Sequence, residues 1–425
     1  MTFLFCLFMA DKSVAQSDDS LLVNLLRSSS SQQVSMVLSN PDKYRLQIIY
    51  TEIIRNKKGV PSFKQHQFHL DPSLYFNPAS MVKMPLAFLS LEKLNRMKVA
   101  GVNKYTAMSF DSSYEKQVPL SKDLSAQNGK PSIAHFIKRA FLISENDPYN
   151  RMYQFVGQGP INRTLHKKGY SSARITREFM GYTEDQNRHT NGIRFYDEFS
   201  NQIYYQLPAF NKDSFRFPAP VLIGDAHINR NEELVASPFD FTRHNNISLE
   251  DMQQMLKAVI FPEAVRKKQR FDLTTEDRIF LLQYLSQYPA ETNYPLYDEK
   301  IFYDCYVKFF FKDSSKRMLP HIRVFNKVGW AYGFLTDVSY VLDTLHGIDY
   351  FLSATLYVNS DGVVNDSKYD EETIGFPFLR ELGRLVYEYE LGRKRAPWPV
   401  LKNPVSTYEK RAPEIRRTTI KEADN

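Results

Sequence analysis

Ser80 and Lys83 are the residues of this sequence whose types and spacing most directly suggest chemistry. They stand in PASMVK, at the start of the apolar run 81–91, where a lysine is costly to bury unless the protein uses it. Residues three apart share one face of a helix, with Cβ atoms about 5–6 Å apart, so the amine can reach the hydroxyl. A serine is a poor nucleophile without a neighbouring base, and a lysine whose pKa falls from about 10.4 to about 7–8 can act as that base.

The same Ser-x-x-Lys spacing occurs twice more, in Ser90/Lys93 and in Ser113/Lys116. Ser90 lies where the predicted helix turns polar, and Ser113 lies in a predicted loop, so both are expected to be solvated surface residues. Only Ser80 stands at the start of a buried helix. Backbone N–H groups point toward an anion there, which suits an oxyanion hole that includes the Ser80 amide.

Two more short motifs accompany this pair. SEN, Ser144–Asn146, is the only Ser-x-Asn in the chain, and KVG, Lys327–Gly329, lies on a predicted strand. Lys-x-Gly also occurs at Lys57 and at Lys167. The first of these lies in a predicted hairpin turn and the second at a predicted helix end, so neither competes with Lys327.

The elements before SEN can be predicted from their periodicity. Leucine and valine recur at helical spacing over 20–38, and β-branched and aromatic residues fill 44–55 and 62–71 on either side of the turn NKKG. A later helix opens at Pro131, a residue that suits the first turn of a helix. Its apolar stripe continues at the same spacing to Ser144, which predicts that Ser144 lies on the buried face.

The rest of the chain returns from helices to strands. Residues 181–240 are rich in proline, asparagine and aromatic residues without clear periodicity, which indicates a loop-dominated insertion. Helical spacing resumes over 248–260 and 274–287, and three strands and a final helix follow from about residue 322. Because both chain ends supply strands and a helix, we expect one antiparallel sheet built from both ends, with a helical block inserted between them.

Taken in order, PASMVK, SEN and KVG resemble the Ser-x-x-Lys, Ser-Asp-Asn and Lys-Thr-Gly motifs of the serine β-lactamase and penicillin-binding protein superfamily. The predicted order of elements is also that of the superfamily, so the resemblance spans nearly the whole chain. The stretch NDPYNRMYQFVGQGPINRTLHKKGY after SEN is most similar to class A β-lactamases.

The resemblance implies a mixed α/β (α+β) fold of the β-lactamase/transpeptidase type. Its antiparallel sheet is formed from both chain ends and flanked by terminal helices, and an all-helical subdomain is inserted. A β-lactamase-like catalytic domain is expected over 16–395, with its sheet part in 40–75 and 320–395. The helical part is expected over 76–319 and includes the loop-rich insertion 181–240.

The resemblance also implies roles for the motif residues in acylation. Ser80 would be the acylated nucleophile and Lys83 its base or proton relay. Ser144 would pass a proton to the leaving nitrogen, and Asn146 would bind the amide of the substrate side chain. Lys327 would hold the substrate carboxylate and help to lower the pKa of Lys83.

Two of the three motifs depart from the superfamily pattern. SEN replaces Ser-Asp-Asn, which is a mild change, whereas KVG lacks the hydroxyl of Lys-Thr-Gly and should bind the substrate carboxylate less well. The resemblance still places Gly329 at the substrate, and the residue after it, Trp330, would supply the second N–H of the oxyanion hole.

The deacylation base has no clear counterpart in this sequence. Class A β-lactamases have a glutamate in an Arg-x-Glu-Pro-x-x-x-Asn-like loop, and here the region reads SSARITREFMGYTEDQNRHTNG, without a clear match. Glu178 is the first candidate for the deacylation base and Glu184 the second. The alternative is that both are ordinary loop charges.

Neither a metal nor a cofactor is expected. His66 and His69 lie at strand spacing without further ligands nearby, and both are predicted to be surface residues. Cys6 and Cys305 are the only cysteines, and one of them lies in a predicted signal peptide. The mature chain would then have one thiol, which allows no internal disulfide and no cysteine metal site.

Composition and the two termini predict where the protein acts. An apolar stretch precedes Ser13 and Ala15, which suit the −3 and −1 positions of a cleavage site, so 1–15 is predicted to be a secretory signal. The protein is therefore expected to be bacterial and periplasmic or secreted. No apolar run approaches the roughly 18–20 residues of a membrane span. Despite a net charge of +7, the basic, proline-containing tail 396–425 indicates a solvated extension rather than a nucleic-acid binder.

Three functions remain open at this point. The first is a serine hydrolase of the β-lactamase family, which opens a β-lactam. The second is a D-Ala-D-Ala peptidase, or penicillin-binding protein, that acts on peptidoglycan with the same three motifs and without the glutamate. The third is a binding protein that keeps the fold and senses cell-wall fragments. In each case the partner is a β-lactam or a small peptidoglycan-derived molecule.

Overall fold

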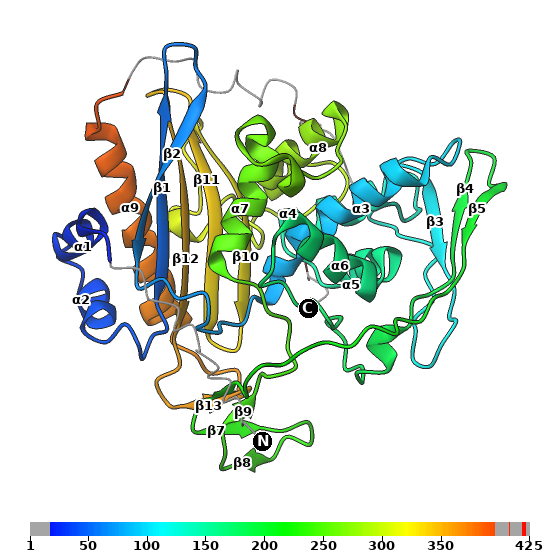
Figure 1. The fold of residues 1–425 in the computed structure, drawn as a ribbon, viewed down its shortest axis with the longest axis horizontal. Helices are drawn as coiled ribbons and strands as arrows, with labels where there is room; N and C mark the ends of the chain where they lie inside the picture. The colour runs from blue at the N-terminus through cyan, green and yellow to red at the C-terminus, as the bar shows by residue number, and fades with distance from the viewer. Residues whose placement is uncertain (1–17, 396–407, 409–418, 422–425) are drawn as a thin grey trace, which may run out of the picture.

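The computed structural model describes residues 18–395, 408 and 419–421 (Figure 1). The predicted signal peptide 1–15 and nearly all of the tail 396–425 lie outside these residues. The helices are α1 Ser20–Arg27, α2 Gln32–Ser39, α3 Lys83–Met97, α4 Ile133–Leu142, α5 Asp147–Val156, α6 Gln158–Lys168, α7 Leu249–Ile260, α8 Thr275–Ser286 and α9 Phe376–Gly392. The strands are β1 Gln47–Arg55, β2 Pro61–Phe68, β3 Ala107–Phe110, β4 Ile193–Tyr196, β5 Gln202–Gln206, β6 Leu222–Ile223, β7 Ala226–Ile228, β8 Leu234–Val235, β9 Phe239–Asp240, β10 Ile322–Ala331, β11 Phe334–Asp343, β12 Ile348–Tyr357 and β13 Val363–Val364.

The central sheet combines strands from both ends of the chain, as the sequence predicts. Its order is β10-β11-β12-β1-β2, and every neighbouring pair is antiparallel. Successive residues of a strand point to opposite faces, so Ile48 and Tyr50 join one apolar core and Ile49 joins the other. Helices α1, α2 and α9 cover the first face, and α7 with the helical part covers the second (Figure 1). The predicted fold class is confirmed.

The helical part surrounds α3, which is buried on nearly all sides. The helix predicted from Pro131 begins at Ile133, where the Ser132 hydroxyl caps it by accepting the N–H of His135 at 3.2 Å. The helical part also contains a sheet in the order β3-β4-β5, which the sequence did not indicate. The insertion 181–240 is largely irregular and is tied to the chain after β12 through the parallel pair β7–β13.

The remaining differences from the predicted elements are local. The predicted helix 20–38 is divided into α1 and α2, and Ser31 caps the second of them. Cys305 is a free, buried thiol. Among the described residues, no helix combines the length and apolarity that crossing a membrane requires.

Candidate active site

Ser80 lies on a short 3-10 turn, Ala79–Val82, that leads directly into α3. The turn is held by Asn77, whose side-chain oxygen accepts the backbone N–H of Ala79 at 2.9 Å. Ala79 has a φ of 43°, a conformation that costs energy for a residue with a Cβ and that tends to occur where function requires it. The Ser80 hydroxyl is thus presented at the head of a buried helix, as predicted.

Lys83 is fully buried and reaches the serine hydroxyl. Its Nζ lies 2.7 Å from Ser80 Oγ and 2.8 Å from Asn146 Oδ1, and it also donates to the Ser144 carbonyl. Burial is the main reason that the pKa of Lys83 lies well below its usual value, and the charge of Lys327 lowers it further. A neutral amine beside a serine hydroxyl can accept its proton, so the geometry suits base catalysis.

Ser144 connects the two lysines. Its hydroxyl lies 3.3 Å from Lys83 Nζ and accepts a hydrogen bond from Lys327 Nζ at 2.7 Å. Burial lowers the pKa of Lys327 to about 7, opposed by Asp337 and assisted by Lys308. Ser144 follows the end of α4 with a φ of 69°, so it reaches the site on a turn rather than on the helix face that the periodicity predicts. Ser80, Lys83, Ser144 and Lys327 form one continuous line of polar groups.

Glu145 explains how SEN can replace Ser-Asp-Asn. Its carboxylate is buried, accepts Arg139 Nε at 2.8 Å and accepts the Tyr297 hydroxyl at 2.5 Å. Arg139 in turn pairs with the buried Asp123 at 2.9 Å. This network anchors the turn that carries Ser144. The sequence did not single out Arg139 or Asp123, although a charged residue within an apolar helical stripe is a signal of a buried partner.

A second buried network supports the strand that carries Lys327. Lys308 donates to Asn326 Oδ1 at 2.6 Å and to the Val324 carbonyl at 2.9 Å. The Asn326 amide donates to Asp337 at 2.9 Å. Burial lowers the pKa of Lys308 and raises the pKa of Asp337. Sequence reasoning missed all three residues, because they come from three separate elements and match no motif.

Gly329 lets β10 pass directly against the Ser80 turn. A Cβ at this position would overlap the Pro78 carbonyl oxygen and would lie 2.9 Å from Met81 Cγ. The next residue, Trp330, lines the cleft with Ser80, and its indole N–H donates to Glu371 at 2.8 Å. The Lys-x-Gly motif therefore places its lysine beside Ser144 and the residue after its glycine in the cleft with Ser80.

The Gly329→Ala variant should weaken both folding and acylation. Because the added methyl group meets backbone, β10 has to move away from the Ser80 turn, and overpacking of this kind costs about 1–3 kcal/mol. We expect a lower melting temperature and at least roughly tenfold slower labelling by a fluorescent penicillin, since small displacements of catalytic groups are expensive. Gly392→Ala is the matched control, because nothing lies within 4 Å of a Cβ there. Equal labelling rates in both variants would contradict the close approach.

Two cavities flank Ser80 and share Asn146 and Trp330. One has a volume of about 540 Å³ and extends toward Glu178 and His244. The other, of about 450 Å³, extends toward Ser144 and Val328. Their size suits a small molecule on either side of the serine hydroxyl.

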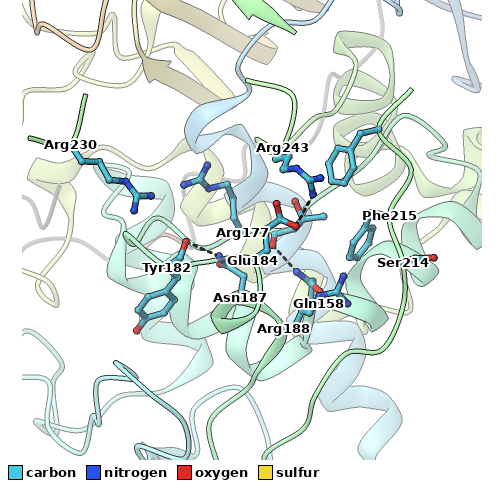
Figure 2. Close-up of a pocket in the computed structure, with 12 residues that line it drawn as sticks. Gln158, Arg177, Tyr182, Glu184, Asn187, Arg188, Ser214, Phe215, Arg230 and Arg243 are labelled. Carbon is cyan, nitrogen blue, oxygen red and sulfur yellow. Dashed lines mark hydrogen bonds and ion pairs between the residues drawn. The ribbon is translucent and has the colours of Figure 1, made fainter. Parts of the chain in front are cut away.

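Of the two candidate deacylation bases, the structure brings only Glu178 to this cleft. Glu178 is buried, lines the cavity that contains Ser80, and accepts Gln154 Nε2 at 2.8 Å. Burial raises its pKa to about 8. Glu184 instead pairs with Arg243 at 2.7 Å and lines a different pocket (Figure 2).

Two predictions of surface position are wrong. Ser90 is buried within α3, and Lys93 donates to Gln206 at 2.6 Å. Ser90 is buried because the helix is enclosed on its polar side as well, a long-range effect that helical spacing does not show. His66 is only 2% exposed and lies between Asp19 and Glu52, because α1 begins beside this strand. The prediction of a surface position is confirmed for Ser113, and His69 is half-buried.

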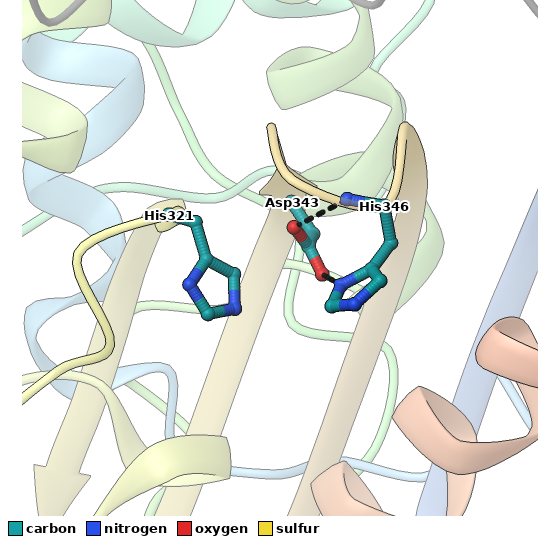
Figure 3. A group of neighbouring side chains, drawn as sticks. All are labelled: His321, Asp343 and His346. Carbon is teal, nitrogen blue, oxygen red and sulfur yellow. Dashed lines mark hydrogen bonds and ion pairs between the residues drawn. The ribbon is translucent and has the colours of Figure 1, made fainter.

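One group of side chains in the described part of the chain has the composition of a metal site. It consists of His321, Asp343 and His346 (Figure 3). His321 directly precedes β10, Asp343 ends β11, and His346 lies in the hairpin between β11 and β12. The Asp343 carboxylate already accepts the backbone N–H of Leu345 at 2.8 Å, the Tyr387 hydroxyl at 2.7 Å and the His346 ring at 2.7 Å. These bonds close the β11–β12 hairpin, which accounts for the group without an ion.

Comparison with known proteins places this chain in a family. Residues 33–389 match the family model described as the β-lactamase enzyme family. The fold is similar to that of a β-lactamase from Sphaerobacter thermophilus, with 13% identity, a TM-score of 0.46, and coverage of 88% of this chain and 98% of that chain. For a β-lactamase from Desulfarculus baarsii the identity is 13%, the TM-score 0.47 and the coverage 89% and 100%.

A PBP-A mutant, solved as its acyl-enzyme with penicillin G, gives 13% identity, a TM-score of 0.47 and coverage of 87% and 96%. The comparison with curated proteins gave no match. The family model spans most of the chain, including all three motifs and both candidate deacylation glutamates. The chain belongs to the β-lactamase enzyme family.

Proposed function

We propose that this protein is a serine hydrolase that opens a β-lactam or a related amide through an acyl-enzyme on Ser80. The observation that supports this most strongly is the buried Lys83 amine 2.7 Å from Ser80 Oγ, with a pKa well below its usual value. Such an amine is uncharged over more of the neutral pH range than an ordinary lysine, so it can take the serine proton.

Acylation then follows from the line of polar groups. Lys83 accepts the Ser80 proton as Oγ bonds to the substrate carbonyl carbon, and the backbone N–H groups of Ser80 and Trp330 stabilise the resulting oxyanion. The proton passes through Ser144 to the amide nitrogen as the carbon–nitrogen bond breaks. Lys327 holds the substrate carboxylate. The negative charge of that carboxylate stabilises the protonated form of Lys327, which burial alone disfavours.

Deacylation needs a water molecule and a base, and we assign the base to Glu178. Its carboxyl group lines the same cavity as Ser80, so a water held between them could be activated there. Because the pKa of Glu178 is about 8, much of it is protonated at pH 7 and cannot act as a base. Hydrolysis of the acyl-enzyme should therefore be slow at neutral pH.

Slow deacylation favours one alternative function. A D-Ala-D-Ala peptidase acting on peptidoglycan would use the same acylation residues and would release β-lactam products slowly. The raised pKa of Glu178 is the observation that keeps this alternative open.

Two assays separate these functions. Steady turnover of nitrocefin with no release of D-alanine from a D-Ala-D-Ala peptide would support the β-lactam hydrolase. Release of D-alanine, with stoichiometric labelling by penicillin and little nitrocefin turnover, would support the peptidase. Absence of nitrocefin turnover, of D-alanine release and of penicillin labelling would refute the proposed hydrolase and leave a binding protein.

A further inference from the structure

A third pocket, separate from the two cavities that flank Ser80, lies beside the loop that carries Glu178 (Figure 2). Its volume is about 340 Å³, and its walls come from the loop 176–188 and from the insertion around residues 214–243. Phe215 and Phe217 contribute aromatic surface, and the rest of the lining is polar. The acylation described above makes no use of this pocket.

The pocket carries a concentrated positive charge. Four arginines line it, and Glu184 is the one acidic lining residue, so its formal net charge is +3. The arginines are Arg177, Arg188, Arg230 and Arg243. Guanidinium groups gathered in one small cavity repel one another, and a bound anion would relieve this repulsion.

Two of these guanidinium groups have no acceptor among the described residues. Arg243 pairs with Glu184 at 2.7 Å, and Arg188 donates to the Asn211 and Asp213 carbonyl oxygens at 2.9 and 2.7 Å. Within the part of the chain that the structure describes, the side chains of Arg177 and Arg230 make no hydrogen bond and no ion pair. Their donors remain available for a ligand.

The pocket is built on a fixed backbone. The Arg177 N–H donates to the side chain of the buried Asn245 at 3.1 Å, and the Arg177 carbonyl accepts the Tyr149 hydroxyl at 2.8 Å. Phe217 lies below the Arg243 guanidinium, with 4.9 Å between the Arg243 carbon and the ring centroid. Arg177 and Arg188 are half-buried, whereas Arg230 and Arg243 are exposed. The fixed backbone at Arg177 lowers the entropic cost of binding an anion there.

Arg177 also lines the cavity that contains Ser80, so it joins the two sites. The positive charge of Arg177 acts in that cavity as well. The pKa of His244 falls to about 3, first because His244 is buried and second because the Arg177 charge disfavours a protonated imidazole. Arg177 is thus the lining residue that the two sites have in common, and a ligand at Ser80 would have to reach past it to enter this pocket.

We propose that this pocket is a subsite for an acidic arm of the substrate that acylates Ser80. The substrate class is then an amide with two anionic groups, one held by Lys327 and a second, distal carboxylate held by the arginines. Planar guanidinium groups suit a carboxylate because they can donate two parallel hydrogen bonds to it. This assignment rests on the proposed function.

The site itself can be tested without any acylation. Citrate, a tricarboxylate, serves as the probe in calorimetric titrations of the full chain carrying Ser80→Ala, at constant ionic strength. Adding Arg230→Gln and Arg243→Gln should weaken citrate binding at least about tenfold, because hydrogen bonds between charged groups are lost. The control pair Arg317→Gln and Arg384→Gln removes the same charge from exposed positions elsewhere and should leave the affinity unchanged. Absence of citrate binding, or equal affinity in both double variants, would overturn the subsite.

The substrate assignment is tested by a matched pair of cephalosporins. One carries a glutaryl side chain, and the other carries a pentanoyl side chain, in which a methyl group replaces the distal carboxylate. We expect the glutaryl compound to acylate Ser80 several-fold faster, and the Arg230→Gln/Arg243→Gln variant to lose this preference. Citrate binding without a glutaryl preference would overturn the substrate arm and leave a site for free anions. If neither compound acylates the protein, the proposed function fails, whereas the citrate titration still decides whether the anion site exists.

Discussion

Replacing Lys83 with arginine should reduce acylation by a β-lactam by about 10²–10⁴-fold, the usual contribution of a general base. Arginine stays protonated in proteins and cannot accept the Ser80 proton. It would also place a larger cation among acceptors that lie 2.7–2.8 Å from the lysine Nζ. The rate is measured as the second-order rate constant of labelling by a fluorescent penicillin.

Lys93→Arg provides the matched control, since Lys93 belongs to the second Ser-x-x-Lys pair and donates to Gln206 instead of to a serine hydroxyl. It should be acylated at the wild-type rate. In the wild type, acylation should decline as the pH falls through the lowered pKa of Lys83, because protonation removes the lone pair that accepts the proton. An active Lys83→Arg variant with unchanged pH dependence would rule out the lysine base.

Replacing Glu178 with glutamine should leave acylation in place and slow deacylation by about 10²–10⁴-fold. The wild type should show a burst of product followed by slow turnover at pH 7. Because burial raises the pKa of Glu178 to about 8, the fraction of ionised base, and with it the deacylation rate, should rise from pH 6 to pH 9. Stopped-flow absorbance with nitrocefin separates the burst from the steady state.

Glu184→Gln is the matched control, because Glu184 pairs with Arg243 outside the Ser80 cleft. It should retain both the burst and the pH dependence. Rapid turnover that neither glutamine substitution affects would show that another group activates the water. Loss of the burst itself in Glu178→Gln would indicate a role in acylation, contrary to the assignment.

The sequence predicted the parts of the site that depend on local geometry. Ser80 and Lys83 lie three residues apart, and helical spacing alone brings their side chains together. The sheet was predictable because β-branched and aromatic residues mark the strands near the N-terminus and because strands also follow from about residue 322. Lys327 and Gly329 could be placed because only one Lys-x-Gly falls on such a strand.

The parts that were missed depend on contacts between distant segments. Ser144 adopts a φ of 69° after its helix has ended, and helical periodicity carries no information about such a turn. His66 is buried by contacts with Asp19 and Glu52, and Ser90 by the packing of the whole helical part around α3. Each of these burials is a property of the assembled fold rather than of its own segment.

The pairing of charges between distant segments could not be predicted from the sequence either. Arg139 pairs with Glu145, six residues away, but its other partner, Asp123, lies in an irregular stretch without a pattern. The choice between Glu178 and Glu184 needed the path of a loop, since neither glutamate stands in a clear match to the loop motif of class A β-lactamases. The structure favours Glu178, because it is buried and lines the cavity that contains Ser80, whereas Glu184 lines another pocket.

Intact mass spectrometry of the penicillin adduct tests the central claim, acylation of Ser80, most directly. A β-lactam ring opens without losing a fragment, so the acyl-enzyme should be heavier by the full mass of penicillin G. The Glu178→Gln background should hold the adduct long enough for measurement, and peptide mapping should place it on Ser80. Adding Ser80→Ala should remove it, whereas adding Ser90→Ala or Ser113→Ala should not. An adduct that persists in the Ser80→Ala variant, or that maps to another serine, would contradict the account.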